Sequence, residues 1–297
     1  FQSEADDRVT AYLLLPECAR PGPSPAVICP HSTTGGSGKD RIAGLAGSKP
    51  GDPPDAPAES RAYGRELARW GYTTLCIDLP GDGERVPPGL PPYNTTAFYK
   101  KHPDWSIMGK IVWDVMRSVD YLHTCEWVDR ERIGCLGHSL GGHTALFAAA
   151  FEPRLAAAVS NGGMLSWVRD TDHWARPPDP RGRPVRSWVY IPRFRQYIEA
   201  PSKPIPIGFD HLMMLAAPRP MLIMSSEDEM RRHDTVDTVA RAATFYRSRN
   251  AGDRITLFSY PGNHNYPPVA KRLSFAWLDR WLAHTPALPT LWPEETV

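Results

Sequence analysis

The sequence lacks three features that would point to particular classes of protein. Its charges balance, with 34 Lys and Arg against 33 Asp and Glu, so no global field would concentrate nucleic acid or an anionic membrane. Its longest apolar run, near Thr144, falls far short of the roughly 20 residues needed to span a bilayer. Its five cysteines are widely spaced and show neither a CxxC motif nor a cysteine–histidine ligand pattern. We therefore expect no nucleic-acid partner, no membrane span and no metal site.

The cysteines and the first residues bear on where the protein works. Unpaired, widely spaced cysteines are typical of small buried side chains in a reduced protein, which favours a cytoplasmic location. Phe1, Gln2 and Ser3 match the end of a common tag-protease recognition sequence, so we interpret residues 1–3 as a cloning remnant. A signal peptide could have been removed with the native N-terminus, which leaves secretion open. We expect residues 4–297 to form a single domain.

Apolar runs typical of strands alternate with longer segments of helical period. This order predicts an α/β protein with a mostly parallel central sheet flanked by helices. Ile107, Ile111 and Val115 recur at helical spacing and predict a helix over about residues 106–123. A stretch over about 167–206, dense in Arg, Trp and Pro, breaks the alternation and predicts a lid-like insertion. The expected strands begin near Val9, Ala26, Tyr72, Arg132, Arg154, Arg219 and Arg254.

The most informative segment is GHSLGG, from Gly137 to Gly142, between an expected strand and an alanine-rich helical segment. Gly-x-Ser-x-Gly in this context is typical of a nucleophile elbow. A serine in so sharp a turn adopts a strained backbone, so the positions two residues away must lack bulk, as Gly137 and Gly141 do. The pattern predicts Ser139 as a catalytic nucleophile, and the alternative is a structural turn.

A serine nucleophile requires a histidine base and a carboxylate that orients this base. His264 lies in a loop directly after the last expected strand, where it can reach the carboxyl edge of the sheet. The acid is expected after the strand before it, among residues 225–229, whose sequence is SSEDE. We expect His138 to be a neighbour of the nucleophile and His31 to orient a loop. The alternative for His264 is a surface or hydrogen-bonded core histidine.

Four segments, GCLGHSLGGH, APRPMLIMSS, RWGYTTLCIDLPGDGER and YPGNHNYPP, together resemble the α/β-hydrolase superfamily, in particular its dienelactone-hydrolase and acetyl-xylan-esterase-like branch. The similarity spans nearly the whole chain in the expected order. It implies the α/β-hydrolase fold, with Ser139 as nucleophile, His264 as general base and Glu229 as acid. Relatives usually have Asp at the acid position, so Asp228 stays open beside Glu229. Adjacent residues in an extended loop point to opposite sides, so we expect only one of the two to serve.

The segment PHSTTGGSGKDR, from Pro30 to Arg41, has the glycines and the lysine of a phosphate-binding loop. A P-loop also requires glycine where Thr33 stands and Ser or Thr where Asp40 stands, so the phosphate interpretation fails. The resemblance implies instead that this loop supplies one backbone amide of an oxyanion hole, from Thr33 or Ser32, and that Leu140 supplies the other. The alternative for residues 35–39 is a flexible surface loop.

The sequence therefore predicts a serine hydrolase that cleaves a carboxylic ester or lactone through an acyl-enzyme on Ser139, without a metal or organic cofactor. Its partner would be a small-molecule substrate, and the oligomeric state stays open. Trp167, Trp188 and Arg193 of the insertion are expected to contact substrate, because such side chains stack on rings and pair with carboxylates; the alternative is a self-packed lid. Two other functions stay open: acyl transfer, C–C bond or peptide hydrolysis by the same triad, and non-catalytic binding on this fold.

Overall fold

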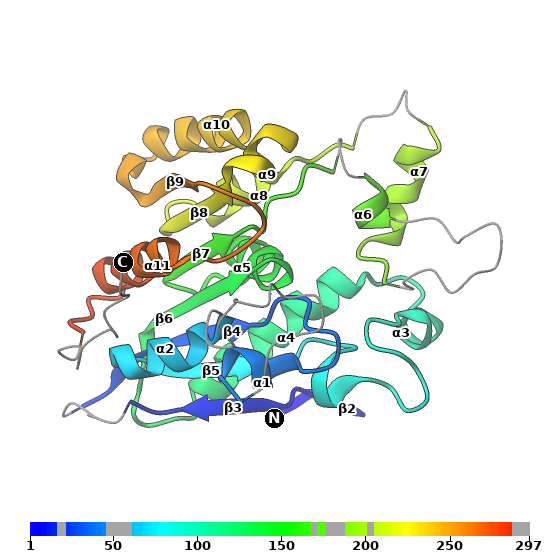
Figure 1. Cartoon of the computed structure of the whole chain (residues 1–297), viewed down its shortest axis with the longest axis horizontal. Coiled ribbons are helices and arrows are strands. Elements are labelled where there is room, and N and C mark those ends of the chain that lie inside the picture. The colour runs from blue at the N-terminus through cyan, green and yellow to red at the C-terminus, as the bar shows by residue number, and fades with distance from the viewer. Residues whose placement is uncertain (17–21, 46–60, 168–170, 176–187, 201–204, 287–297) are drawn as a thin grey trace.

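The computed structural model describes residues 1–16, 22–45, 61–167, 171–175, 188–200 and 205–286. In these residues seven strands form one central sheet, shown in Figure 1. The β3 strand pairs antiparallel with β5, and the other neighbouring pairs are parallel, so the prediction of a mostly parallel sheet is confirmed. In spatial order the strands are β3 (Ala11–Leu14), β5 (Thr73–Ile77), β4 (Ser24–Pro30), β6 (Val128–His138), β7 (Ala157–Asn161), β8 (Met221–Ser226) and β9 (Ile255–Tyr260).

Helices cover both faces of this sheet, which is why β5 and β7 are buried at every residue. Alternate side chains of a strand enter opposite cores: Ile28 packs on one side of β4 and Val27 on the other. The first core is covered by α4 (Ile107–Leu122), α5 (Leu140–Phe151), α8 (Phe209–Ala216) and α10 (Thr235–Ser248). The second is covered by α1 (Gly38–Ile42), α2 (Tyr63–Trp70) and α11 (Pro268–Trp281). The predicted helix over 106–123 is α4.

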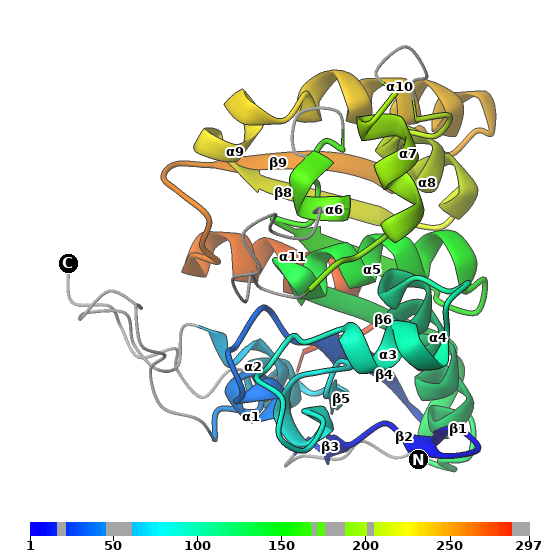
Figure 2. The ribbon, with the colours of Figure 1, turned by 90° about the vertical axis from the view of Figure 1, so that its right-hand side faces the viewer.

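Shorter elements complete the described chain, and several lie on the side toward which the parallel strands point (Figure 1). Figure 2 looks from that side and shows α6 and α7, both from the predicted insertion, in front of the sheet. Residues 168–170, 176–187 and 201–204 of the insertion lie outside the described residues. The shorter elements are β1 (Gln2–Glu4), β2 (Asp7–Arg8), η2 (Gly83–Arg85), α3 (Thr96–Lys101), α6 (Thr171–Ala175), η3 (Pro192–Phe194), α7 (Arg195–Ile198), α9 (Glu227–Arg232) and η4 (Gly252–Arg254).

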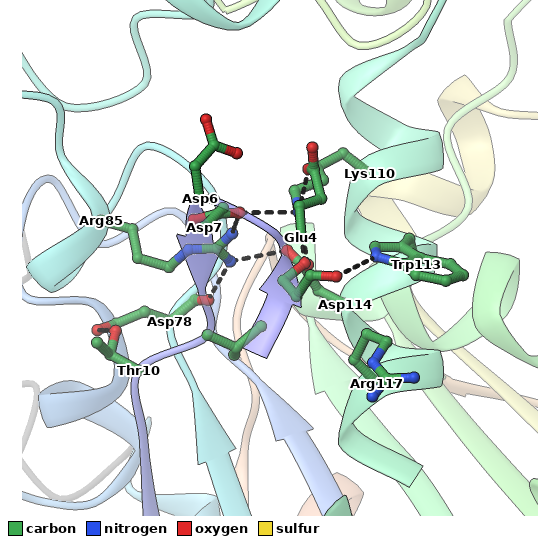
Figure 3. Close-up of polar contacts among 12 residues, drawn as sticks. Glu4, Asp6, Asp7, Thr10, Asp78, Arg85, Lys110, Trp113, Asp114 and Arg117 are labelled. Carbon is green, nitrogen blue, oxygen red and sulfur yellow. Dashed lines mark hydrogen bonds and ion pairs between the residues drawn. The ribbon is translucent and has the colours of Figure 1, made fainter. Parts of the chain in front are cut away.

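The first three residues, predicted from the sequence to be a cloning remnant, pack against the rest of the fold. They begin the β1–β2 hairpin beside α4, and the buried Ser3 hydroxyl donates a hydrogen bond to Asp114. Figure 3 shows the ion pairs around this contact. Arg85 lies 2.7 Å from both Asp7 and Asp114, and Lys110 approaches the same two carboxylates at 2.8 and 3.0 Å. These pairs join the hairpin, η2 and α4.

Four of the cysteines, Cys29, Cys76, Cys125 and Cys135, are buried free thiols, as the sequence predicted. Cys18 lies outside the described residues. Within the described ranges, no helix combines the length and the apolar character that a membrane crossing requires.

Candidate active site

The Gly-x-Ser-x-Gly segment forms a sharp turn between β6 and α5. Ser139 has φ 59° and ψ −119°, a backbone conformation that costs a non-glycine residue roughly 1–3 kcal/mol. A Cβ atom on Gly137 would lie 2.1 Å from the carbonyl oxygen of Gly141, and one on Gly141 would lie 2.2 Å from that of Pro30. The glycines are therefore required by close backbone packing on both sides of the serine.

The structure brings Ser139, His264 and Glu229 together from the carboxyl ends of three strands. The Ser139 hydroxyl oxygen lies 2.7 Å from Nε2 of His264, in the loop between β9 and α11. Nδ1 of His264 lies 2.5 Å from Oε1 of Glu229. In this chain of contacts a proton can move from the hydroxyl to the imidazole. The carboxylate stabilises the imidazolium cation that forms.

Glu229 occupies a helix, which corrects the expectation that residues 225–229 form an extended loop. The β8 strand continues to Ser226, and α9 begins at the next residue. The Ser226 hydroxyl accepts a hydrogen bond from the Glu229 amide at 3.3 Å, and Glu229 Oε2 accepts one from the Ser226 amide at 3.2 Å. This capping box fixes the carboxylate side chain and leaves Oε1 for His264.

Burial differs sharply among the ionisable side chains of the site. Glu229 is 5% exposed, whereas the His264 side chain is 43% exposed and open to a substrate. Burial raises the pKa of Glu229, but hydrogen bonds from His264 and Ser226 outweigh it and hold this pKa below its ordinary value. Burial also lowers the pKa of His143 to about 3 and that of His138 well below the ordinary histidine value. Both of these histidines are therefore neutral neighbours near neutral pH.

The predicted oxyanion loop lies against the elbow. Leu140 is the first residue of α5, so its amide points out of the positive end of a helix dipole. Thr33 follows β4 in the loop that precedes α1. A Cβ on Gly141 would lie 2.2 Å from the Pro30 carbonyl oxygen and 3.2 Å from that of His31, so the loop and the elbow are in direct backbone contact.

Lys39, in the segment whose sequence resembles a phosphate-binding loop, forms ion pairs with two carboxylates of the protein. Lys39 is 3% exposed, and its ammonium group lies 2.8 Å from Asp78 and also contacts Glu84. Its amide donates to Asp78 at 2.7 Å, and the Gly36 amide donates to Asp82 at 2.6 Å. These contacts agree with the sequence argument against a phosphate site. Across the described ranges, no cluster of three or more His, Cys, Asp or Glu is arranged to hold a metal ion.

The three predicted substrate contacts occupy different environments. Trp167 is 2% exposed and stacks on Phe209 with ring centroids 4.3 Å apart, so it packs in the core of the described structure. Trp188 is 9% exposed and packs edge-on against Tyr93. The Arg193 side chain is 72% exposed and lies 3.2 Å from Asp104.

Sequence patterns did not identify three residues that contact the site. Asn161, at the end of β7, hydrogen-bonds His138 and the loop that carries His264. Asp82 and Tyr93 hydrogen-bond the loop after β4. Their contacts join segments far apart in the chain, so no local motif marks them.

The fold, with a serine, a histidine and a carboxylate in hydrogen-bond contact, defines a serine ester hydrolase of the α/β-hydrolase superfamily, as the sequence predicted. The sequence model of the family described as "Glucuronyl esterase, fungi" matches residues 93–248. This match covers more than half of the chain, and the chain belongs to this family.

Individual relatives agree with this class. A Bacillus subtilis (strain 168) protein, YtaP, whose name assigns it as a hydrolase, is 24% identical over 283 residues, covering 93% of this chain and 84% of the relative. Carbohydrate esterase MZ0003, from an unknown prokaryotic organism, is 29% identical over 168 residues, which cover 53% of this chain and only 37% of that protein. A glucuronoyl esterase of carbohydrate esterase family 15 from Caldicellulosiruptor kristjansonii has the same fold, with TM-score 0.66 and 19% identity over 97% of this chain and 78% of that one.

Proposed function

We propose that Ser139, His264 and Glu229 are the catalytic triad of this esterase. A neutral His264 that carries its proton on Nδ1, toward Glu229, leaves Nε2 to accept the proton of the Ser139 hydroxyl 2.7 Å away. The serine oxygen then bonds to the carbonyl carbon of the ester. The protonated His264 next donates this proton to the leaving alcohol, which yields the acyl-enzyme. Water, deprotonated by His264, releases the acid and restores the serine.

The oxyanion of each tetrahedral intermediate would be held by the backbone amides of Leu140 and Thr33. The contact between the elbow and the loop after β4 supports this pairing, because Leu140 precedes Gly141 in the elbow and Thr33 lies two residues after His31 in the loop. An oxyanion hole acts through donors about 2.7–3.1 Å from the developing charge, and losing one costs roughly 10² to 10³ in rate. Since both donors are backbone groups, the path of the main chain matters more than the side chains of these two residues.

We place the ester on a carbohydrate. The match to a glucuronyl esterase family and the similarity to a carbohydrate esterase support this class. Trp188 and the exposed Arg193 belong to the insertion, on the side toward which the parallel strands point, and we assign them to the pocket wall. An arginine there can donate to hydroxyl or carboxylate oxygens of a sugar.

Covalent labelling tests the triad. A fluorophosphonate should label the wild-type protein and fail to label Ser139→Ala. Ser225→Ala is the matched control, since this buried β8 hydroxyl lies in the same sheet and has no part in the proposed chemistry, and it should be labelled like wild type. Labelling of Ser139→Ala at the wild-type rate would refute the assignment.

A substrate panel tests the carbohydrate class. Acetylated sugars, uronic acid methyl esters, lactones and simple aryl esters would be compared by kcat/KM, with ethanol added as a competing nucleophile. We expect carbohydrate esters to rank first and free acid to dominate the products. A preference for aryl esters would overturn the substrate class, and ethyl ester products in excess of acid would indicate acyl transfer.

A further inference from the structure

The loop from His31 to Gly36, which carries the proposed Thr33 amide, is held by one buried carboxylate. Asp82 is 0% exposed and follows β5. Its oxygens accept hydrogen bonds from the Thr34 hydroxyl and from the Gly36 amide, the latter at 2.6 Å. The residues that flank Thr33 on its C-terminal side are therefore fixed to a different strand end.

Tyr93 adds a second attachment to the same place. Its hydroxyl donates to Asp82 and accepts a hydrogen bond from the Thr34 amide at 2.6 Å. The backbone of Tyr93 has φ 63°, a conformation that L side chains rarely adopt, and its amide donates to the Gly81 carbonyl at 2.7 Å. Strain of this kind persists only where surrounding contacts enforce it. The strained backbone aims the phenol at the loop.

The N-terminal side of the loop is fixed by His31. The Leu79 amide donates to His31 Nε2 at 3.0 Å, so Nδ1 carries the proton and donates to the Ser32 carbonyl at 2.7 Å. The proposed donor Thr33 thus lies between two fixed neighbours, Ser32 and Thr34. Leu79, which binds His31, and Asp82, which binds Thr34, both belong to the turn after β5.

This turn is itself anchored in the N-terminal ion-pair network. Arg85 donates to the main-chain carbonyl of Asp78 at 3.0 Å, and its own carbonyl accepts from the Gly81 amide at 3.2 Å. Its guanidinium also reaches Asp7 and Asp114, as Figure 3 shows. The turn that carries Asp82 is thereby tied to the β1–β2 hairpin and to α4.

We propose that Asp82 and Tyr93 are positioning residues that set the oxyanion hole by fixing the path of the loop around Thr33. This inference rests on the proposed function, since it requires Thr33 to be an oxyanion donor. Neither residue would touch the substrate: Tyr93 acts through the Thr34 amide, and Asp82 acts through the Thr34 hydroxyl and the Gly36 amide. Because the donors of an oxyanion hole work within a few tenths of an ångström, a loop that relaxes loses transition-state binding while substrate binding is retained.

The protonation state of Tyr93 supports a role that is constant with pH. Burial, and then the neighbouring Asp82 charge, raise the pKa of Tyr93 far above its ordinary value. The phenol keeps its proton and continues to donate to Asp82 throughout the working range. Loss of this hydroxyl should therefore change the height of the pH–rate profile and leave its shape unchanged.

The test compares an aryl ester with its thionoester, in which sulfur replaces the carbonyl oxygen. Sulfur is a weak hydrogen-bond acceptor, so the thionoester gains little from oxyanion amides. Tyr93→Phe should lower kcat for the ester about tenfold, with KM within about twofold, and should lower the ester-to-thionoester rate ratio by a similar factor. Asp82→Asn should lower both by about 10² or more if it folds.

Tyr99→Phe is the matched control. Like the Tyr93 hydroxyl, this hydroxyl donates one hydrogen bond and accepts one from a backbone amide: it donates to the Val189 carbonyl at 2.5 Å and accepts from the Ile107 amide at 3.0 Å. It does not reach the loop after β4. It should leave kcat and the ester-to-thionoester ratio at wild-type values. The proposal is overturned if Tyr93→Phe keeps the wild-type ester-to-thionoester ratio, whether because neither substrate is slowed or because both are slowed equally. A wild-type protein that neither hydrolyses esters nor labels at Ser139 would instead refute the proposed function.

Discussion

The main-chain carbonyl of Asn161 accepts a hydrogen bond from the Ser139 amide at 2.8 Å, so the end of β7 holds the proposed nucleophile. The Asn161 side chain extends this contact. Its amide group donates to His138 Nδ1 at 3.0 Å and to the Asn265 carbonyl at 3.1 Å, and its oxygen accepts from the Tyr260 hydroxyl at 2.8 Å. One buried residue therefore joins the elbow to the loop that carries the proposed base.

We predict that Asn161→Asp lowers kcat by about 10- to 100-fold, because misplaced reacting groups lose rate steeply. A carboxylate has nearly the same shape but cannot donate to His138 or to the Asn265 carbonyl. Tyr260→Phe, which removes only one of these contacts, should have a smaller effect. Steady-state kinetics at equal folded concentration, verified by circular dichroism, measures both. A wild-type kcat for Asn161→Asp would show that the network does not position the triad.

The choice between the two acidic neighbours gives the second prediction. Glu229→Gln should lower kcat on the order of 10⁴, by analogy with the serine-protease triad, because the amide cannot stabilise the imidazolium. Asp228→Asn changes a residue whose amide bonds the Gly262 carbonyl through the main chain, so kcat should stay within about twofold. Comparing kcat for the two variants decides the assignment, and a reversed order would identify Asp228 as the acid.

Local sequence patterns predict much of this candidate site. The elbow is set by residues 137–141, and His264 lies in the loop that follows β9, so both are predicted without tertiary information. The helix that carries Glu229 was not predicted, because an extended loop was assumed after β8. Ser226-Glu227-Asp228-Glu229 is a capping-box pattern, Ser-x-x-Glu, and would have indicated that a helix begins there.

The remaining contacts depend on tertiary structure. Asp82, Tyr93 and Asn161 act on segments about 20 to 100 residues away in the chain, and one sequence contains no signal for such pairings. Trp167 illustrates the same limit, because the sequence marks it as an aromatic of the insertion but does not show that its ring stacks on Phe209. Periodicity gives the face of a regular element but not the side-chain directions in irregular segments.

Substrate preference gives the third prediction. Arg193→Ala should change the relative kcat/KM among charged and neutral sugar esters by about tenfold, since an exposed arginine that meets a substrate oxygen contributes one charge-assisted hydrogen bond. Fluorophosphonate labelling of Ser139 should be unaffected. Arg280→Ala is the control, because this arginine of α11 is 59% exposed and pairs with Asp253 of η4. Identical rankings in the two variants would remove Arg193 from the pocket.

Acid stability gives the fourth prediction. Burial lowers the pKa of His143 to about 3 and of His138 well below the ordinary value, whereas in the unfolded chain histidine titrates near ~6.5. Below about pH 6.5 the unfolded state therefore binds more protons, and the free energy of unfolding falls by about 1.4 kcal/mol per pH unit for each histidine.

Urea unfolding at several pH values between about 5.5 and 6.5 measures this slope, more than about one pH unit above the ordinary pKa of Asp and Glu. His143→Gln should reduce it by about half, because glutamine keeps a donor for the Gly163 carbonyl but takes up no proton. Equal slopes for the variant and the wild type would mean that His143 is not the group excluded from protonation.

The fifth prediction concerns Gly162, which has φ 56° and faces the proposed base. A Cβ atom there would lie 2.9 Å from His264 Cε1, so Gly162→Ala must displace the imidazole and should lower kcat by about 10². Gly89→Ala is the matched control: Gly89 also has positive φ, 75°, but no atom within 4 Å of the added methyl. Both variants should lose about 1–2 kcal/mol of stability from backbone strain, so only the kinetics distinguish them. Equal kcat values would show that His264 tolerates the displacement.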